Sequence, residues 1–339
     1  MPSFHFLCTA EPTPRYRRMV QLWAWSIRQR AGALAMAPIT VTYNDAPDPE
    51  AARFLEAMKV RVETRPRLST SHREVNKYNS LWAEGLDQAD WIVLMDCDTA
   101  VIDDLAPLPG LLDHVDLAAA PEGHDPRMPP PGRPRGYRAI RGYERLLLSE
   151  TGLTPDQLAG HRHPWFTGHW PCTDYPYFNG GVIVLRASRL IEFRERILDT
   201  SRRLFRRMRH IHPNPVYFLQ RFWNSRWDRT PWADHLCIGS FFRQRYADQV
   251  ALAVAAIAGR FPYRVLPHAW NWRSTGMQHG EESPIRILHY FEPALGLDTN
   301  RITDSDWIDA YRASHNPGQQ ALAAIVSDFL RSTGPNVHP

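Results

Sequence analysis

The chain has 339 residues, of which 43% are hydrophobic and 22% are charged, and its formal net charge at pH 7 is +4. This composition excludes a disordered, highly charged protein and provides enough apolar residues for a sizeable core. The small net charge permits an anionic ligand but gives no argument for binding nucleic acid.

The N-terminal part alternates short apolar runs, which predict strands, with amphipathic stretches, which predict helices. In chain order we expect a strand at Phe4–Thr9, a helix at Tyr16–Arg30, a strand at Ile39–Tyr43, a helix at Glu50–Met58, a strand at Val60–Val62, a helix at Lys77–Leu86 and a strand at Trp91–Met95. Such alternation predicts an α/β fold with a mainly parallel sheet, whose ligands bind beyond the carboxyl ends of the strands.

After a further strand at Val115–Ala120, the segment Glu122–Cys172 begins with many Pro and Gly residues, which predict irregular structure. We interpret it as a long inserted loop. Beyond it we expect a strand at Gly181–Leu185, a helix from Ala187 to His210, a helix at Asp248–Ala258, strands at Arg264–Leu266 and Ile285–His289, and a helix at Gln319–Leu330.

Two carboxylates, Asp96 and Asp98, directly follow the apolar strand WIVLM. Carboxylates on alternate residues can converge on one Mg²⁺ or Mn²⁺ ion, which would also bind phosphate oxygens. The alternative is a turn in which an aspartate caps backbone amides. The position at the carboxyl end of a central strand favours the metal site.

Three later segments also carry polar groups. Asn179 is followed by Gly180 and Gly181, which let the backbone approach a ligand closely, although a tight turn would explain them as well. Asp248 and Gln249 open an apolar helix, where an aspartate also suits the helix dipole. His289 ends a strand and could be a third metal ligand or a hydrogen-bonded structural residue. Asn271, within the tryptophan-containing run His268–Arg273, is a further site candidate.

In this order, the strand with DxD, the FNGG strand, the DQ helix start and the late strand ending in His resemble retaining glycosyltransferases of the GT-A fold. The resemblance is to the group of glycogenin, lipopolysaccharide galactosyltransferase and galactinol synthase, and it covers about Ser3–Pro293. It implies a Rossmann-like, mixed and mainly parallel sheet flanked by helices. It also implies transfer of a sugar, with retention, from a nucleoside diphosphate sugar, such as a UDP-sugar, to an acceptor hydroxyl.

The resemblance assigns roles to residues of this chain. Asp96, Asp98 and His289 would bind Mn²⁺ or Mg²⁺. Asn179 would contact the donor sugar or its acceptor, and Asp248 and Gln249 would lie near the anomeric carbon. The donor nucleotide would be contacted by Leu7, Cys8 and Thr9 at the base, by Lys77 with Arg73 as a second candidate, and by Asp96, Gly180 and Gly181.

The chain also departs from the family pattern. The family's late motif reads HxxGxxKPW, whereas HYFEPALG lacks its first Gly and its Lys. Arg273 or Arg286 could replace that lysine at the diphosphate. The insertion at 122–172 has no clear counterpart, and we expect acceptor choice to depend on it.

Three other functions remain open. An inverting GT-A transferase would use an Asp or Glu as general base. A sugar nucleotidyltransferase would show a Gly-rich basic loop after the first strand, but CTAEPTPRYRR contains no glycine. A zinc-stabilised binding module could use His161, His163, His169 and Cys172, although their spacing matches no common zinc motif.

For the whole chain we expect a single domain over residues 1–339, with a helical extension at about 295–339. We expect a cytoplasmic protein, because the four cysteines are widely spaced and the sequence shows no signal-peptide pattern. We expect no transmembrane segment, because no apolar run reaches the about 18–20 residues needed to span a bilayer. Peripheral contact with a membrane stays open. The acceptor could be a glycan, a lipid-linked intermediate, a small molecule or a protein, and the sequence gives no oligomeric state.

Overall fold

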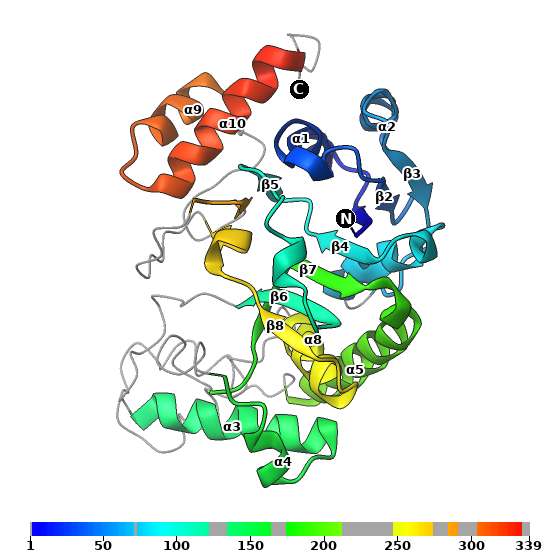
Figure 1. The fold of residues 1–339 in the computed structure, drawn as a ribbon, viewed down its shortest axis with the longest axis vertical. Helices are drawn as coiled ribbons and strands as arrows, with labels where there is room; N and C mark the ends of the chain where they lie inside the picture. Colours follow the sequence, from blue (N-terminus) through cyan, green and yellow to red (C-terminus); the bar gives the residue numbers. More distant parts are fainter. Residues whose placement is uncertain are drawn as a thin grey trace.

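A mixed, mainly parallel sheet forms the centre of the protein (Figure 1). The computed structural model describes residues 2–70, 73–121, 134–163, 174–211, 247–273, 284–290 and 304–333. Within them, seven strands pair in the order β3-β2-β1-β4-β7-β6-β8. Their bounds are β1 Phe4–Ala10, β2 Ile39–Tyr43, β3 Arg61–Thr64, β4 Trp91–Met95, β6 Leu117–Pro121, β7 Phe178–Arg186 and β8 Tyr263–Val265. The predicted α/β class is confirmed.

Strand β7 is antiparallel to both of its neighbours, β4 and β6, whereas the other pairs of this sheet are parallel. Because β7 runs in the opposite direction, it begins at the edge where β4 ends. Met95 faces Val182 in the register, and the Asp96 amide donates to the Gly181 carbonyl at 2.9 Å. The polar start of β7 therefore lies beside the two aspartates that follow β4.

A second sheet of three strands lies beyond that edge, in the order β5-β10-β9. Its strands are β5 (Thr99–Val101), β9 (Trp272–Arg273) and β10 (Ile287–His289). His289 faces Thr99 across the antiparallel β5–β10 pair, and the Tyr290 amide donates to the Asp98 carbonyl at 3.0 Å. This pairing brings the end of β10 to the DxD segment.

Helices cover both faces of the main sheet, because alternate residues of each strand point to opposite sides. In β4, Trp91 and Val93 pack into the core under α1, whereas Ile92 and Leu94 pack into the core under α5 and α8. The helices are α1 Pro14–Arg30, α2 Pro49–Ala57, α3 Pro134–Thr151, α4 Pro155–Ala159, α5 Leu190–Ile211, α8 Ala247–Ala258, α9 Ser305–Arg312 and α10 Pro317–Thr333. Figure 1 shows α9 and α10 at the opposite end of the molecule from α3 and α4.

Local sequence explains where the first two of these helices begin. The Thr13 hydroxyl accepts from the Tyr16 amide, and Pro14 stands at the first helical position of α1. The Asp48 carboxylate accepts from the amides of Glu50 and Ala51 at the start of α2. These capping bonds fix the N-termini within two residues of the predicted ones.

Two predictions were wrong in detail. The segment 122–172 was predicted to be a loop, but it contains α3 and α4. Tyr143 and Leu147, one helical turn apart, are buried in the core, and Thr154 makes a capping box with Gln157. These stabilising contacts follow the Pro-rich stretch, whose prolines obscured the helical pattern.

The second error concerns the helix predicted at Lys77–Leu86. The chain forms instead a 3₁₀ helix, η2, over Arg73–Trp82. The Asn76 side chain exchanges two hydrogen bonds with the backbone of Ser69, and the Thr9 hydroxyl accepts from the Ser80 amide. These tertiary bonds explain why η2 departs from ordinary α-helical geometry, which is uncommon over so many residues.

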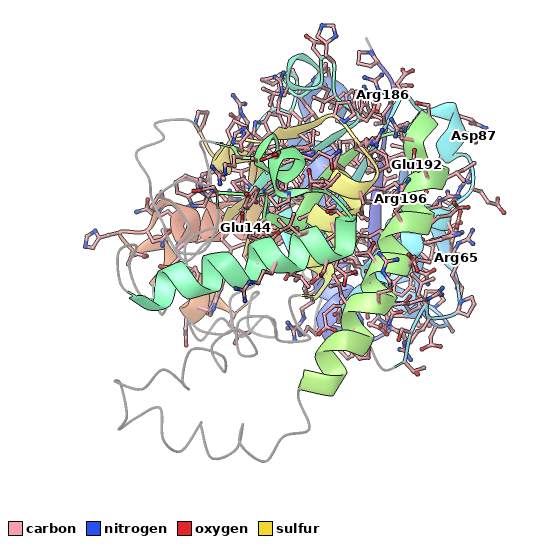
Figure 2. All side chains as sticks on the ribbon, turned by 90° about the horizontal axis from the view of Figure 1, so that it is seen from below. Arg65, Asp87, Glu144, Arg186, Glu192 and Arg196 are labelled. Carbon is pink, nitrogen blue, oxygen red and sulfur yellow. The ribbon has the colours of Figure 1, made fainter. Side chains whose placement is uncertain are left out.

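The outer face of α5 is charged and solvated (Figure 2). Glu192 and Arg196 form an i,i+4 ion pair there, with Nε 3.0 Å from a carboxylate oxygen. Such exposed pairs contribute little stability, on the order of 0.3–0.5 kcal/mol. No helix among the described residues is both long enough and apolar enough to cross a membrane.

Candidate active site at the strand ends

A cluster of three potential metal ligands lies where β4 ends. The carboxylates of Asp96 and Asp98 and the imidazole of His289 each offer one atom, and these atoms all lie within 4.8 Å of one another. Asp98 is 9% exposed. Two carboxylate oxygens and one imidazole nitrogen can bind a divalent cation. The residues therefore fit a divalent metal ion, and their chemistry does not select one metal.

Two of these side chains, those of His289 and Asp98, interact directly in the folded chain. His289 Nε2 lies 3.4 Å from Asp98 Oδ1. Burial would raise the pKa of the Asp98 carboxyl, but His289 lowers that pKa overall by its positive charge and its hydrogen bond. The ring nitrogen that faces the carboxylates is thus Nε2, so a metal at this cluster would bind His289 through Nε2.

Asp96 gives a pH prediction for the metal-free protein. Burial, partly opposed by the Lys77 ammonium and reinforced by Asp98, raises the pKa of its carboxyl from 3.8 to about 6. The folded chain binds this proton more tightly than the unfolded chain, so the contribution of Asp96 to stability falls as pH rises from about 4 to 6. Thermal unfolding in EDTA should show that Asp96→Asn removes this decline. An unchanged pH profile in the variant would contradict the assignment.

An ion pair lies beside the metal ligands. Lys77 Nζ is 2.6 Å from Asp248 Oδ2 and 3.9 Å from Asp96 Oδ2. Burial alone would lower the pKa of the Lys77 ammonium, but the carboxylates, chiefly Asp248, raise it overall. Lys77 comes from η2 and Asp248 from the first turn of α8. A positive charge therefore stands next to the three potential metal ligands.

The space beside the two glycines of β7 is filled by side chains of the site. A Cβ at Gly180 would stand 2.0 Å from Lys77 Nζ, and one at Gly181 would stand 2.5 Å from His289 Nδ1. Both glycines let functional groups approach the backbone. Their predicted contact with a bound donor stays a prediction.

This packing predicts different effects for two matched substitutions. Gly181→Ala should lower Mn²⁺ affinity by at least about tenfold, because the methyl group displaces the partly buried ring of a proposed metal ligand. Gly180→Ala should keep most of the affinity, since the methyl group clashes with the end of the Lys77 side chain and touches Asp248 Oδ2 at 3.4 Å, but reaches no proposed metal ligand. Titration with Mn²⁺, without nucleotide, measures both. Equal losses in the two variants would show that the crowding around these glycines is misassigned.

The other predicted residues lie close by. Asn179 is buried at 4% exposure, and its Oδ1 accepts from the Gly181 amide at 2.7 Å. Gln249 follows Asp248 in the first turn of α8 and is partly exposed. Asn179 thus joins the cluster through Gly181, and Gln249 joins it as the neighbour of Asp248. Their roles toward a sugar stay predictions.

The residues predicted to contact the nucleotide differ in their burial and in their hydrogen bonds. Leu7 and Cys8 are fully buried, and the Thr9 hydroxyl donates to the Lys77 carbonyl at 2.8 Å. Thr9 therefore anchors the segment that carries Lys77. The side chain of Arg73 lies outside the described residues.

One charged residue near the cluster had no role in the sequence analysis. The positive charge of Arg15, in the first turn of α1, makes a small contribution to the lowered pKa of Asp98. No motif marks Arg15, because its position depends on how α1 packs against the end of β4. The basic sequence PRYRR was the only signal.

The structure describes only some of the residues proposed to replace the missing lysine or to bind zinc. Arg286 forms an ion pair with Asp103 at 2.6 Å and donates to the Asp104 carbonyl, so its guanidinium is already engaged there. The side chain of Arg273 lies outside the described residues, as do two members of the zinc set, His169 and Cys172. Cys8 and Cys97 are free thiols, as expected.

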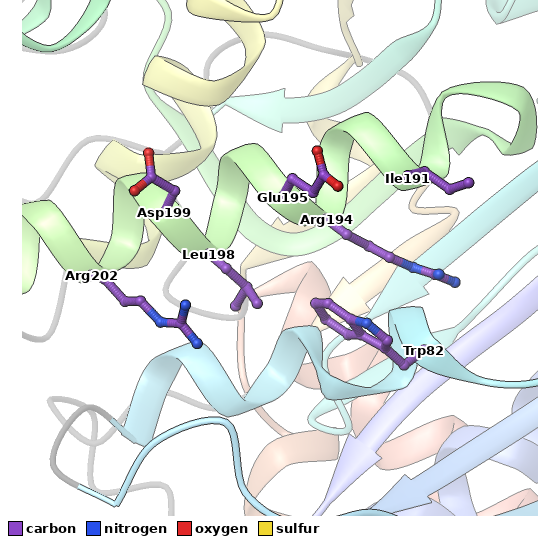
Figure 3. Close-up of a pocket in the computed structure, with 7 residues that line it drawn as sticks. All are labelled: Trp82, Ile191, Arg194, Glu195, Leu198, Asp199 and Arg202. Carbon is purple, nitrogen blue, oxygen red and sulfur yellow. The ribbon is translucent and has the colours of Figure 1, made fainter.

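A groove between α5 and η2 lies apart from these residues (Figure 3). Its volume is about 370 Å³. The Arg194 guanidinium lies over the Trp82 ring, 5.4 Å from its centroid, and Leu198 lines the same wall. None of the predicted site residues lines this groove. The concentration of titratable groups therefore identifies the strand ends as the candidate site.

Comparison with protein-family models and with curated proteins gives no match. Among solved structures, mouse xyloside xylosyltransferase 1 in its apo form is 14% identical with a TM-score of 0.43, and the alignment covers 85% of this chain and 97% of that one. The apo WbbM bifunctional glycosyltransferase is 12% identical with a TM-score of 0.44, over 86% of this chain and 46% of that one. This chain thus spans less than half of WbbM.

Proposed function

We propose that the protein is a metal-dependent glycosyltransferase that uses a nucleoside diphosphate sugar, with a UDP-sugar as the first donor to test. The observation that carries the proposal is the convergence of Asp96, Asp98 and His289 within 4.8 Å, beside the Lys77 ammonium. A diphosphate leaving group needs both features, because negative charge develops on it as the glycosidic bond breaks. We further propose Mn²⁺ as the metal and retention of the anomeric configuration.

The residues divide into two groups in this mechanism. Asp96, Asp98 and His289 would hold the ion, which supplies Lewis-acid neutralisation of the leaving diphosphate when bound. Lys77 adds a positive charge 3.9 Å from Asp96 Oδ2. Asn179 and Gln249 would orient the sugar through hydrogen bonds. Asp248 would face the anomeric carbon.

Retention can follow two routes, and Asp248 has a different part in each. In double displacement Asp248 is the nucleophile, whereas in front-face attack it stabilises an oxocarbenium-like transition state. Its carboxylate lies 2.6 Å from the Lys77 ammonium, and an ion-paired carboxylate is a weaker nucleophile. This contact supports the front-face route.

The proposal is tested with a panel of nucleotide sugars in the presence of Mn²⁺. Thermal stabilisation identifies the donor, since a ligand at 100 times its Kd stabilises the native state by about 2.7 kcal/mol. Slow hydrolysis should then release a nucleoside diphosphate, whereas a nucleotidyltransferase would release pyrophosphate from a nucleoside triphosphate. A sugar product of inverted configuration, observed by NMR, would exclude the retaining mechanism. Absence of any Mn²⁺-dependent donor binding would exclude the function.

A further inference from the structure

A buried pair of amides connects two parts of the site. Asn271, at the end of the 3₁₀ turn η7 (His268–Asn271), is 2% exposed, and its Nδ2 donates to Asn179 Oδ1 at 2.8 Å. The same oxygen accepts from the Gly181 amide at 2.7 Å. An amide oxygen has two lone pairs, so both are used. The orientation of the Asn179 side chain is therefore fixed, with its NH₂ group turned away from Gly181.

The bonding pattern also fixes the orientation of Asn271. A backbone N–H can only donate, so the Asn179 atom that meets the Gly181 amide must be oxygen. The Asn271 atom that meets this oxygen must in turn be the donor, Nδ2. The amide oxygen of Asn271 consequently faces the other way. This oxygen is buried and has no hydrogen-bond donor among the described residues.

The Asn271 oxygen faces the metal-binding side of the site. It lies 2.8 Å from the position that a Cβ on Gly181 would take, and His289 Nδ1 lies 2.5 Å from the same position. β9 pairs with β10 directly after Asn271, and His289 faces Arg273 in this parallel pair, two residues beyond Asn271. When Nε2 of a histidine binds a metal, the proton is on Nδ1 and needs an acceptor. Among the described residues, Asn271 Oδ1 is a buried acceptor close to that side of the ring, and it makes no hydrogen bond there in this structure.

We propose that Asn271 is a positioning residue that acts on both halves of the site. Its NH₂ group sets the orientation in which Asn179 presents its own NH₂ to a ligand, and its oxygen provides an acceptor beside the outer nitrogen of His289. One uncharged amide thereby couples the sugar-facing Asn179 to the metal ligand. The first half rests on the proposed function, whereas the second half concerns metal binding alone.

Asn271→Asp separates the effect of Asn271 on turnover from its effect on metal binding, because only turnover should fall. The carboxylate cannot donate to Asn179, so turnover of the nucleotide sugar should fall by about 10–100-fold. A carboxylate beside the imidazole makes the histidine a stronger ligand, so Mn²⁺ affinity, titrated without nucleotide, should be maintained or should rise. Asn271→Leu, which has neither group, should lower both. Parallel losses in the Asp and Leu variants, or no change in either, would overturn the proposal.

A double-mutant cycle tests whether Asn271 acts through Asn179. If it does, adding Asn271→Asp to Asn179→Ala should lower turnover no further, whereas multiplied losses would show independent roles. Asn79→Asp is the matched control, because Asn79 Nδ2 donates to Asn44 Oδ1 in another buried pair, also at 2.8 Å. This control should lower thermal stability yet leave Mn²⁺ affinity unchanged. If it lowers that affinity as much as Asn271→Leu does, the link between Asn271 and His289 is overturned.

The two proposals can fail separately. If the wild-type protein binds Mn²⁺ but hydrolyses no nucleotide sugar, the proposed function fails. The opposite Mn²⁺ responses of the Asp and Leu variants would still establish the link to His289. If turnover is present but the variants respond in parallel, only the inference about Asn271 fails.

Discussion

Asp98→Asn is expected to abolish metal-dependent hydrolysis of the donor, with a loss of at least about 100-fold. The carboxylate is one of three converging ligands, and its partner His289 Nε2 lies 3.4 Å away. The asparagine keeps the shape of the side chain but removes its negative charge. Mn²⁺ affinity, measured by titration without nucleotide, should fall together with turnover.

Asp103→Asn is the matched control for this substitution. Asp103 lies five residues further along the chain, and its carboxylate pairs with Arg286 at 2.6 Å rather than with the cluster. Its loss should leave Mn²⁺ affinity unchanged. If Asp98→Asn retains normal affinity, or if both variants lose it equally, the metal site is not where the three ligands converge.

The sequence could identify Asp96 and Asp98 because their signal is local. An apolar strand followed by alternate carboxylates places both groups at a sheet edge, and β4 is buried as expected. For His289 the sequence left a metal ligand and a structural residue both open, since its proximity to Asp98 depends on the pairing of β10 with β5. β5 has only three residues, which are too few to show a periodic pattern in the sequence.

The ion pair of Lys77 with Asp248 could not be predicted from local pattern either. The two residues are far apart in sequence, and they meet because η2 and α8 both pack on the same face of the sheet. The sequence also could not show which groups occupy the space beside the two glycines. Gly180 and Gly181 were expected to make room for a ligand, and the structure fills that room with Lys77, His289 and Asn271. Proximity of this kind follows from packing, which the order of residues does not show.

The Lys77–Asp248 pair leads to the second large prediction, which concerns stability. The side chain of Asp248 is 8% exposed and that of Lys77 is 18% exposed. Removing one partner of a buried pair leaves an uncompensated charge, at a cost of about 3–5 kcal/mol. Lys77→Met should therefore lower the free energy of unfolding by roughly this amount. Urea denaturation in EDTA measures it without any contribution from bound metal.

Asp248→Asn should cost less, because Lys77 retains a second carboxylate, Asp96, at 3.9 Å. The double variant Lys77→Met with Asp248→Asn should recover much of the stability that Lys77→Met loses, since no unpaired Asp248 carboxylate remains. Both single variants should nevertheless lose most of their turnover, because one lacks the fixed cation and the other the carboxylate near the sugar. Stability and activity thus respond differently to loss of the Lys77–Asp248 pair.

If the two single-variant costs simply add in the double variant, the contact contributes no coupling energy. The role of Lys77 would then be limited to the proposed binding of a donor diphosphate.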